Sequence, residues 1–140
     1  MYVVKQLELA LRSRLDDIVR SSGITTLQYT ALTVLDRHGG RSLAQLARDS
    51  FVTPQSVAFL VSNLERQGLV RRDRNPDSRR ELIVSLTPAG RELLTLYSGA
   101  VNELEQLMTA SLSDEETETF RSLLDRCRFD VLQPETHPEQ

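Results

Sequence analysis

Two short helices with good capping residues are predicted to follow each other directly, and this pair constrains the fold of the 140-residue chain more than any other feature. Ser42 and Gln45 have the spacing of a capping box, in which side chains satisfy backbone N–H groups at a helix start. Thr53 can cap the next helix, where Pro54 suits the first helical position. This second helix ends at Gly68 and has one apolar stripe at helical spacing, formed by Val57, Leu60, Val61 and Leu64.

The opposite face of the second helix is mostly polar. It carries no acidic residue before Glu65, so it could approach phosphate groups without repulsion. Small or amide-bearing side chains near a helix N-terminus fit the major groove of DNA and can form hydrogen bonds with base edges. The residues of this face are Gln55, Ser56, Ala58, Phe59, Ser62 and Asn63.

After Gly68 the apolar residues alternate, which predicts a β-hairpin. Residues 75–78 have the composition of its turn. From Arg66 to Arg80 the chain contains six Arg and two Asp. A two-stranded ribbon with Arg at its tip can enter the minor groove, where the negative potential attracts Arg. A solvated hairpin without this role is the alternative, and it is less favoured directly after a capped helix pair.

These residues resemble the MarR (multiple antibiotic resistance regulator) family of bacterial winged-helix transcription factors. The hairpin contains Asp77-Ser78-Arg79, and the returning strand leads into Leu86-Thr87-Pro88-Ala89-Gly90. These segments match the family's Asp-x-Arg and Leu-Thr-x-x-Gly patterns. Leu27-Gln28-Tyr29 and residues 42–47 and 64–71 match as well, so the resemblance extends over roughly residues 7–129.

We expect a mainly α fold, an α+β winged helix with about six helices and a small antiparallel β-hairpin wing. Apolar stripes at helical spacing predict a first helix at residues 3–20 and another at residues 26–38. A long helix is predicted to start at Thr87 and Pro88. Ser113 begins the last helix, because it forms a capping box with the Glu three residues later.

The resemblance implies three regions. Residues 1–22 and 91–132 form a helical dimerisation region, and residues 23–90 form the winged helix-turn-helix that binds DNA. Residues 133–140 contain two Pro and no apolar stripe, and they are predicted to be a loose tail. A monomer whose terminal helices close on themselves is the alternative to a homodimer.

The resemblance and the charge pattern rank the candidate DNA contacts. Arg79 comes first, as the wing-tip Arg in the minor groove, and Asp77 is expected to orient it through a salt bridge. Ser42 is expected to donate to a phosphate. Phe59 stands where many relatives have a basic residue, and it suits either a thymine methyl group or packing. The other contacts are assigned to Thr53, Pro54, Gln55, Ser56 and Asn63 of the second helix and to Arg71, Arg72, Arg74 and Arg80 of the wing.

A small aromatic or phenolic effector is implied by the resemblance, bound between the dimerisation helices and the winged helix. Arg12, Tyr29 and His38 are candidate polar residues of that site, although Tyr29 equally fits a half-buried core position. Cys127 is the single cysteine and lies on the apolar side of the last helix, so we expect a buried structural thiol. Regulation by a ligand is therefore favoured over regulation by oxidation.

Catalysis, cofactors and metals are not expected. The two histidines, His38 and His137, lack the partners of a nucleophilic site, and the sequence shows no metal-ligand cluster. No stretch is apolar enough to cross a bilayer, and the N-terminus lacks a signal-peptide pattern, which predicts a soluble cytoplasmic protein without a membrane partner. The net charge is −3, but residues 66–100 carry +3 and residues 101–140 carry −7. The positive charge thus lies in the predicted DNA-binding region.

The sequence supports two functional hypotheses. The first is a homodimeric, sequence-specific transcriptional regulator that binds a near-palindromic operator in double-stranded DNA. We expect this regulator to be a repressor. A small-molecule ligand would release it from that operator. The second is a winged-helix protein–protein interaction module without DNA binding, which the acidic net charge and Phe59 would suit. Salt-dependent DNA affinity discriminates between the two.

Overall fold

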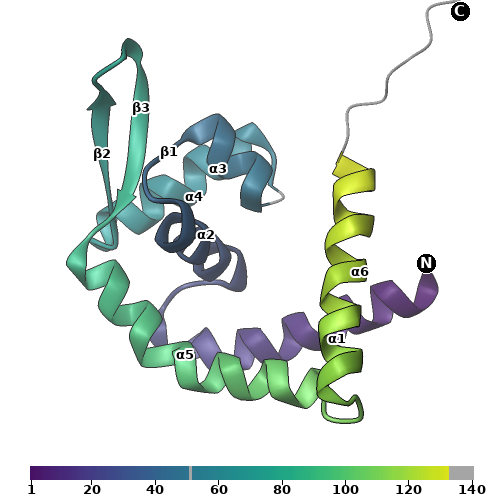
Figure 1. Ribbon diagram of the computed structural model, residues 1–140. Coiled ribbons are helices and arrows are strands. Elements are labelled where there is room, and N and C mark those ends of the chain that lie inside the picture. The colour runs from purple at the N-terminus through teal and green to yellow at the C-terminus, as the bar shows by residue number, and fades with distance from the viewer. Residues whose placement is uncertain (51, 133–140) are drawn as a thin grey trace, which may run out of the picture. The chain divides into compact units, whose positions relative to one another are not determined.

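The computed structural model describes residues 1–50 and 52–132, so the predicted tail at residues 133–140 lies outside the described residues. The chain divides into two compact units, residues 1–104 and residues 105–140. The described residues form six α-helices, one short 3-10 helix and a three-stranded antiparallel sheet (Figure 1). The predicted mainly α fold with a small β wing is confirmed.

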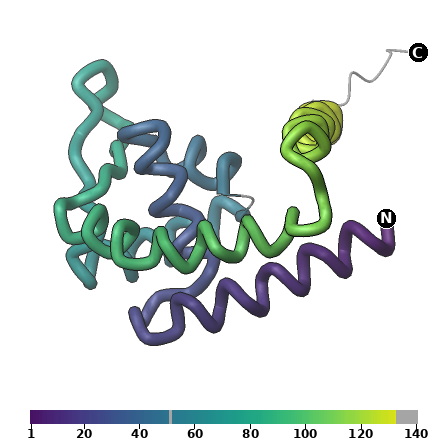
Figure 2. Tube along the Cα trace, turned by 60° about the horizontal axis from the view of Figure 1, so that its bottom comes forward, coloured from purple at the N-terminus to yellow at the C-terminus, as the bar shows by residue number. Residues whose placement is uncertain are grey.

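The helices of the first unit are, in chain order, α1 (Tyr2–Val19), the 3-10 helix η1 (Arg20–Ser22), α2 (Thr26–His38), α3 (Leu43–Ser50) and α4 (Pro54–Arg66). Its strands are β1 (Arg41–Ser42), β2 (Val70–Asn75) and β3 (Ser78–Leu86). The chain then continues through α5 (Pro88–Met108) and α6 (Asp114–Leu132). Figure 2 shows how the chain turns at η1, between α1 and α2. Among the described residues, no helix has the length and apolar character needed to span a membrane.

Side-chain caps fix where the helices begin. At α3, Gln45 N donates to Ser42 Oγ at 3.2 Å, and Ser42 N donates to Gln45 Oε1 at 3.1 Å. At α4, Ser56 N donates to Thr53 Oγ1 at 3.1 Å, and Pro54 occupies the first turn. Ser113 caps α6 in the same way as Ser42 caps α3. The predicted caps are confirmed, and they explain why α3 and α4 are separate helices.

Gly68 ends α4 in the left-handed conformation, with φ of 74°. Leu69 N then donates to Leu64 O at 3.0 Å, which satisfies a carbonyl group at the helix end. Because a side chain disfavours positive φ, glycine suits this position. The chain can therefore turn directly from α4 into β2.

The sheet has the strand order β1-β3-β2. Val70 pairs with Leu86 at the base of the hairpin, and Arg41 pairs with Val84 on the other side of β3. The two-residue strand β1 was not predicted, because two residues carry no periodicity. Since α3 follows β1 immediately, the base of the wing is joined to the helix pair (Figure 1).

The core of the first unit lies between α2, α3, α4 and the base of the sheet. The predicted stripe of α4 is confirmed, since all four of its residues are buried. Burial of a large aliphatic side chain contributes about 1.5–3 kcal/mol, so these contacts hold α4 in place. The largest fully buried apolar side chains are those of Val19, Leu32, Leu46, Val57, Val61, Leu64, Val70 and Val84.

A joint between α4 and α5 is formed around Thr87. Its Oγ1 donates to Gly68 O at 2.5 Å and accepts from Gly90 N at 3.2 Å, and its N donates to Leu69 O at 3.1 Å. Gly90 is buried, and a Cβ on it would collide with the carbonyl oxygen of Leu69. The Leu-Thr-x-x-Gly motif is therefore the sequence of this joint.

In the second unit, α6 has no buried residue among those described. Cys127 is exposed, which corrects the prediction of a buried thiol, because an apolar helix face does not by itself show that another element packs on it. The N-terminal part of α1 also exposes apolar side chains. The exposed large apolar residues of α1, α5 and α6 include Tyr2, Val3, Val4, Leu107, Leu123, Leu124, Phe129 and Val131.

Candidate nucleic-acid interface

Helix α4 has two distinct sides. Its apolar stripe is buried, whereas Gln55, Ser56 and Phe59 face outward and are exposed. Phe59 is 72% exposed, so it does not pack in the core of the described chain. Ser62 and Asn63 continue the outward face and are half-buried. The structure thus brings most of the predicted contacts of this helix onto one surface.

Several polar groups on α4 already have partners within the helix. Thr53 Oγ1 donates to Ser56 Oγ at 2.9 Å in addition to its capping bond. Asn63 Oδ1 accepts from Arg66 Nη1 at 3.3 Å. The hydroxyl hydrogen of Ser56 and the amide hydrogens of Asn63 therefore remain available to an external acceptor, whereas the hydroxyl hydrogen of Thr53 is used internally.

Free arginines gather near the tip of the wing. Arg74, Arg79 and Arg80 are exposed, and within the described residues they have neither an ion pair nor a hydrogen-bonded side-chain partner. Arg71 lies 3.1 Å from Asp73, but both side chains are largely exposed. Such exposed pairs contribute little to stability, so Arg71 can exchange its partner for a phosphate.

The turn of the wing is held by two hydrogen bonds of the Asn75 side chain. Asp77 N donates to Asn75 Oδ1 at 3.0 Å, and Asn75 Nδ2 donates to Glu81 Oε2 at 2.8 Å. The expected salt bridge between Asp77 and Arg79 is not among the ion pairs of the described residues. Arg79 is therefore held at the tip by the hairpin itself, which projects from the first unit in Figure 1.

Arg72 of β2 is bound to α4. Its Nε lies 2.8 Å from Glu65 Oε2, and its Nη2 donates to Ser62 Oγ at 2.8 Å. The Ser62 hydroxyl in turn donates to Ala58 O at 2.9 Å. In the free protein this guanidinium is bonded to α4, and its phosphate contact stays a prediction. The sequence did not reveal these partners, because they lie in a different element from Arg72.

Ser42 also differs from its predicted role. It is 4% exposed, and its Oγ accepts the capping bond from Gln45 N. The structure places it in the base of the sheet as the cap of α3, not as an open phosphate contact. Ser50, also buried, leaves its hydroxyl without a hydrogen-bond partner among the described residues.

Comparison with known proteins decides the family. The sequence profile of the MarR family matches residues 22–81. A Thauera aromatica protein assigned to regulation of the hcr operon is 34% identical over 117 residues, which cover 84% of this chain and 70% of that protein. The chain belongs to the MarR family. The resemblance predicted from the sequence is thereby confirmed.

Two further similar proteins agree with this assignment. An HTH-type transcriptional repressor of Mycobacterium tuberculosis is 28% identical over 129 residues, 92% of this chain and 93% of that protein. The solved complex of S. aureus MepR with DNA has a TM-score of 0.81 and 25% identity, and the match covers 92% of this chain and 96% of that one. The chain is therefore a DNA-binding transcriptional regulator of the MarR family, and the prediction that it is not an enzyme is confirmed.

The candidate effector residues of this MarR-family chain come from two helices, Arg12 from α1 and Tyr29 and His38 from α2. Arg12 lies 2.5 Å from Glu8, and the pKa of Glu8 is lowered by the hydrogen bond from Lys5 and by Arg12. Tyr29 is buried in α2, and His38 is exposed at the end of that helix. Their role in ligand binding stays a prediction.

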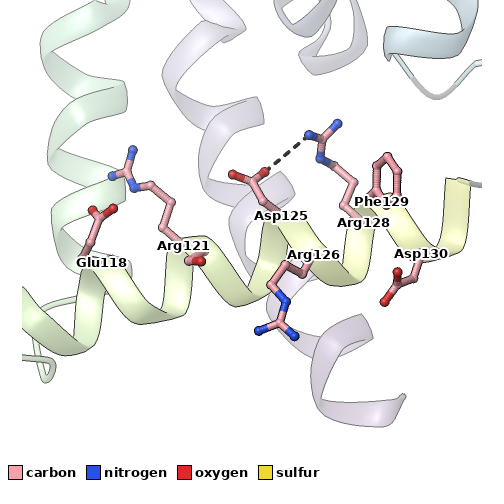
Figure 3. Close-up of a pocket in the computed structure, with 8 residues that line it drawn as sticks. Glu118, Arg121, Asp125, Arg126, Arg128, Phe129 and Asp130 are labelled. Atoms are coloured by element: carbon pink, nitrogen blue, oxygen red, sulfur yellow. Dashed lines mark ion pairs between the residues drawn. The ribbon is translucent and has the colours of Figure 1, made fainter.

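Two surface hollows among the described residues bear on where a ligand could bind. One is bordered by η1 and the start of α5, where Ser21 Oγ and Tyr97 OH share a hydrogen bond of 2.9 Å. The other is bordered by α6 alone, with Asp125 and Arg128 paired at 3.4 Å (Figure 3). A single helix does not enclose a ligand. The described residues contain no cluster of His, Cys, Asp and Glu that could hold a metal ion.

Arg72 is expected to position the wing, and removal of its partner tests this. Glu65→Ala should weaken operator binding although it removes a negative charge next to the DNA surface, because the clamp between β2 and α4 is lost. Arg72→Ala should weaken binding by a similar factor. The operator affinity of both variants is measured at several salt concentrations. Stronger binding of Glu65→Ala would show that Glu65 acts only by repelling phosphates.

Proposed function

We propose that this MarR-family regulator is a homodimeric repressor that acts in the cytoplasm, binds a near-palindromic operator and is released by a small aromatic ligand. The DNA-binding part of the proposal is supported by the outward face of α4, which lies next to a wing with free arginines at its tip. A helix in the major groove reads base edges, and wing arginines suit the narrow, negative minor groove. Gln55, Ser56, Phe59, Asn63, Arg79 and Arg80 are the contacts that we propose.

A homodimer is supported by the apolar side chains that the single chain leaves exposed. Leu123, Leu124 and Phe129 of α6 and Val4 of α1 are all exposed. Apolar residues at this density along two helices are typical of surfaces that become buried on association. A two-fold dimer would set two copies of α4 about one DNA turn apart, which is the reason to expect a near-palindromic site.

The oligomeric state provides a direct test. Leu124→Glu should shift the protein from dimer to monomer in sedimentation equilibrium, because a charge would be buried in the proposed interface. Ser122→Glu adds the same charge to the same helix at an exposed polar position and should leave the dimer intact. A Leu124→Glu variant that stays dimeric would place the interface elsewhere.

Repression and ligand release are supported by relatives. The M. tuberculosis relative is named a repressor. The structure of Bordetella bronchiseptica BpsR, at 20% identity and a TM-score of 0.80, is described as explaining regulation of DNA binding by 6-hydroxynicotinic acid. We propose the same kind of control here. Small aromatic carboxylates should then release this protein from its operator, whereas aliphatic acids of similar size should not.

Operator binding is tested by titrating the purified protein on the DNA upstream of its own gene at two salt concentrations. We expect tight binding that survives excess random competitor and weakens with salt, because phosphate contacts release counterions. Addition of candidate aromatic ligands to the same assay tests release. Weak binding that is abolished by random competitor DNA would show that this upstream DNA contains no operator. It would favour a protein partner for the winged helix.

A further inference from the structure

We infer that Phe59 recognises the 5-methyl group of a thymine in the major groove, so that α4 selects a thymine in each half-site of the operator. This inference rests on the proposed function and names the base chemistry that α4 reads. It starts from the position of the ring. Phe59 lies three residues after Ser56 and four residues before Asn63, which places it in the middle of the outward face.

Most of the surface of the Phe59 side chain is exposed to solvent in the free protein. Phe59 is 72% exposed, whereas its neighbours Val57, Leu60 and Val61 are buried in the core. A single exposed apolar residue is common on protein surfaces and by itself indicates no partner. On the outward face of a helix that enters the major groove, however, the ring meets base edges, among which the thymine methyl group is the apolar one.

The hydrogen-bonding state of the neighbouring side chains points to the same base. Ser56 Oγ already accepts from Thr53 Oγ1 at 2.9 Å, and Asn63 Oδ1 accepts from Arg66 Nη1 at 3.3 Å. Ser56 and Asn63 can therefore still act mainly as hydrogen-bond donors. In the major groove, thymine presents the O4 acceptor next to its methyl group, whereas cytosine presents a donor. Donors on both sides of an apolar ring therefore match thymine.

The same surface lacks the basic side chains that usually recognise guanine. From Pro54 to Asn63 the helix has neither Arg nor Lys, which are the usual bidentate partners of guanine O6 and N7. The first basic residue, Arg66, bonds to Asn63 at the end of the helix. The charge for DNA affinity is thus supplied by the wing, and α4 is left with contacts that favour A·T pairs.

The test replaces thymine by uracil, which differs only by the missing methyl group, at one symmetric pair of operator positions at a time. At the symmetric pair that meets Phe59 we expect the replacement to weaken binding about fifteenfold, which is about fourfold for the buried methyl group lost in each half-site. Phe59→Ala should bind the thymine and uracil operators equally well. Phe59→Leu should keep the preference for thymine.

Each other outcome overturns the inference in a recognisable way. Specific operator binding that is insensitive to every replacement would reject the reading of thymine and leave the proposed function intact. A thymine preference that persists in Phe59→Ala would assign it to another residue or to DNA stiffness. Absence of specific binding by the unmodified protein would reject both proposals. Circular dichroism of Phe59→Ala should match that of the unmodified protein, because the ring is outside the core.

Discussion

Replacement of Arg79 by Ala is expected to weaken operator binding at least about thirtyfold. One specific Arg contact contributes about 1–3 kcal/mol, and a dimer presents two wings. Arg79 is exposed at the wing and bonds to no other described side chain, so its loss should remove the proposed DNA contact and leave the fold unchanged. The measurement is a titration of the variant on the operator at one fixed salt concentration.

Arg37→Ala is the matched control for this experiment. Arg37 is exposed in the last turn of α2, outside the proposed DNA contacts, and its replacement removes the same charge. We expect an affinity within about a factor of two to three of the unmodified protein, since the long-range effect of one charge is screened at physiological salt. Equal affinities of the Arg79→Ala variant and the unmodified protein would remove the wing from the mechanism.

Gly90→Ala is expected to lower the free energy of unfolding by about 1–3 kcal/mol, the usual cost of forcing extra atoms into a packed site. The added Cβ would collide with the Leu69 carbonyl oxygen and lie 2.9 Å from Leu86 Cδ2. The carbonyl group cannot move aside freely, because it accepts the hydrogen bond from Thr87 N. Urea unfolding at a fixed protein concentration measures the effect, since the proposed dimerisation would make stability depend on concentration.

Gly99→Ala in the same helix should change stability in the opposite direction. A Cβ at Gly99 would meet no atom within 4 Å. Alanine is favoured over glycine inside a helix by about 0.5–1 kcal/mol, so this variant should be more stable by that amount. If both variants were stabilised equally, the close approach of α5 to the end of α4 would not exist in solution.

The local parts of the fold were predictable from the sequence, because their causes are local. The caps Ser42, Thr53 and Ser113 identified the starts of α3, α4 and α6, and Gly68 marked the turn after α4. Each signal depends on residues within one helical turn of the boundary. The outward face of α4 followed from the same periodicity that predicted its buried stripe.

What the sequence did not predict depends on partners distant in the chain. Arg72 was assigned to a phosphate because its charge is visible in the sequence, whereas its bonds to Glu65 and Ser62 appear only once β2 lies beside α4. The pairing of β1 with β3 is equally non-local. Cys127 was expected to be buried because its helix face is apolar, but the sequence does not show which element covers such a face, and Cys127 is exposed.

The two-sided construction of α4 has a consequence for how such regulators diverge. The residues that hold the helix in place, among them Val57 and Leu64, are separate from those that face outward, among them Gln55 and Phe59. Surface substitutions away from special features change stability by less than about 0.5 kcal/mol. After gene duplication, a copy of this chain could therefore acquire a different set of target genes through a few outward substitutions, with no compensating change in its interior.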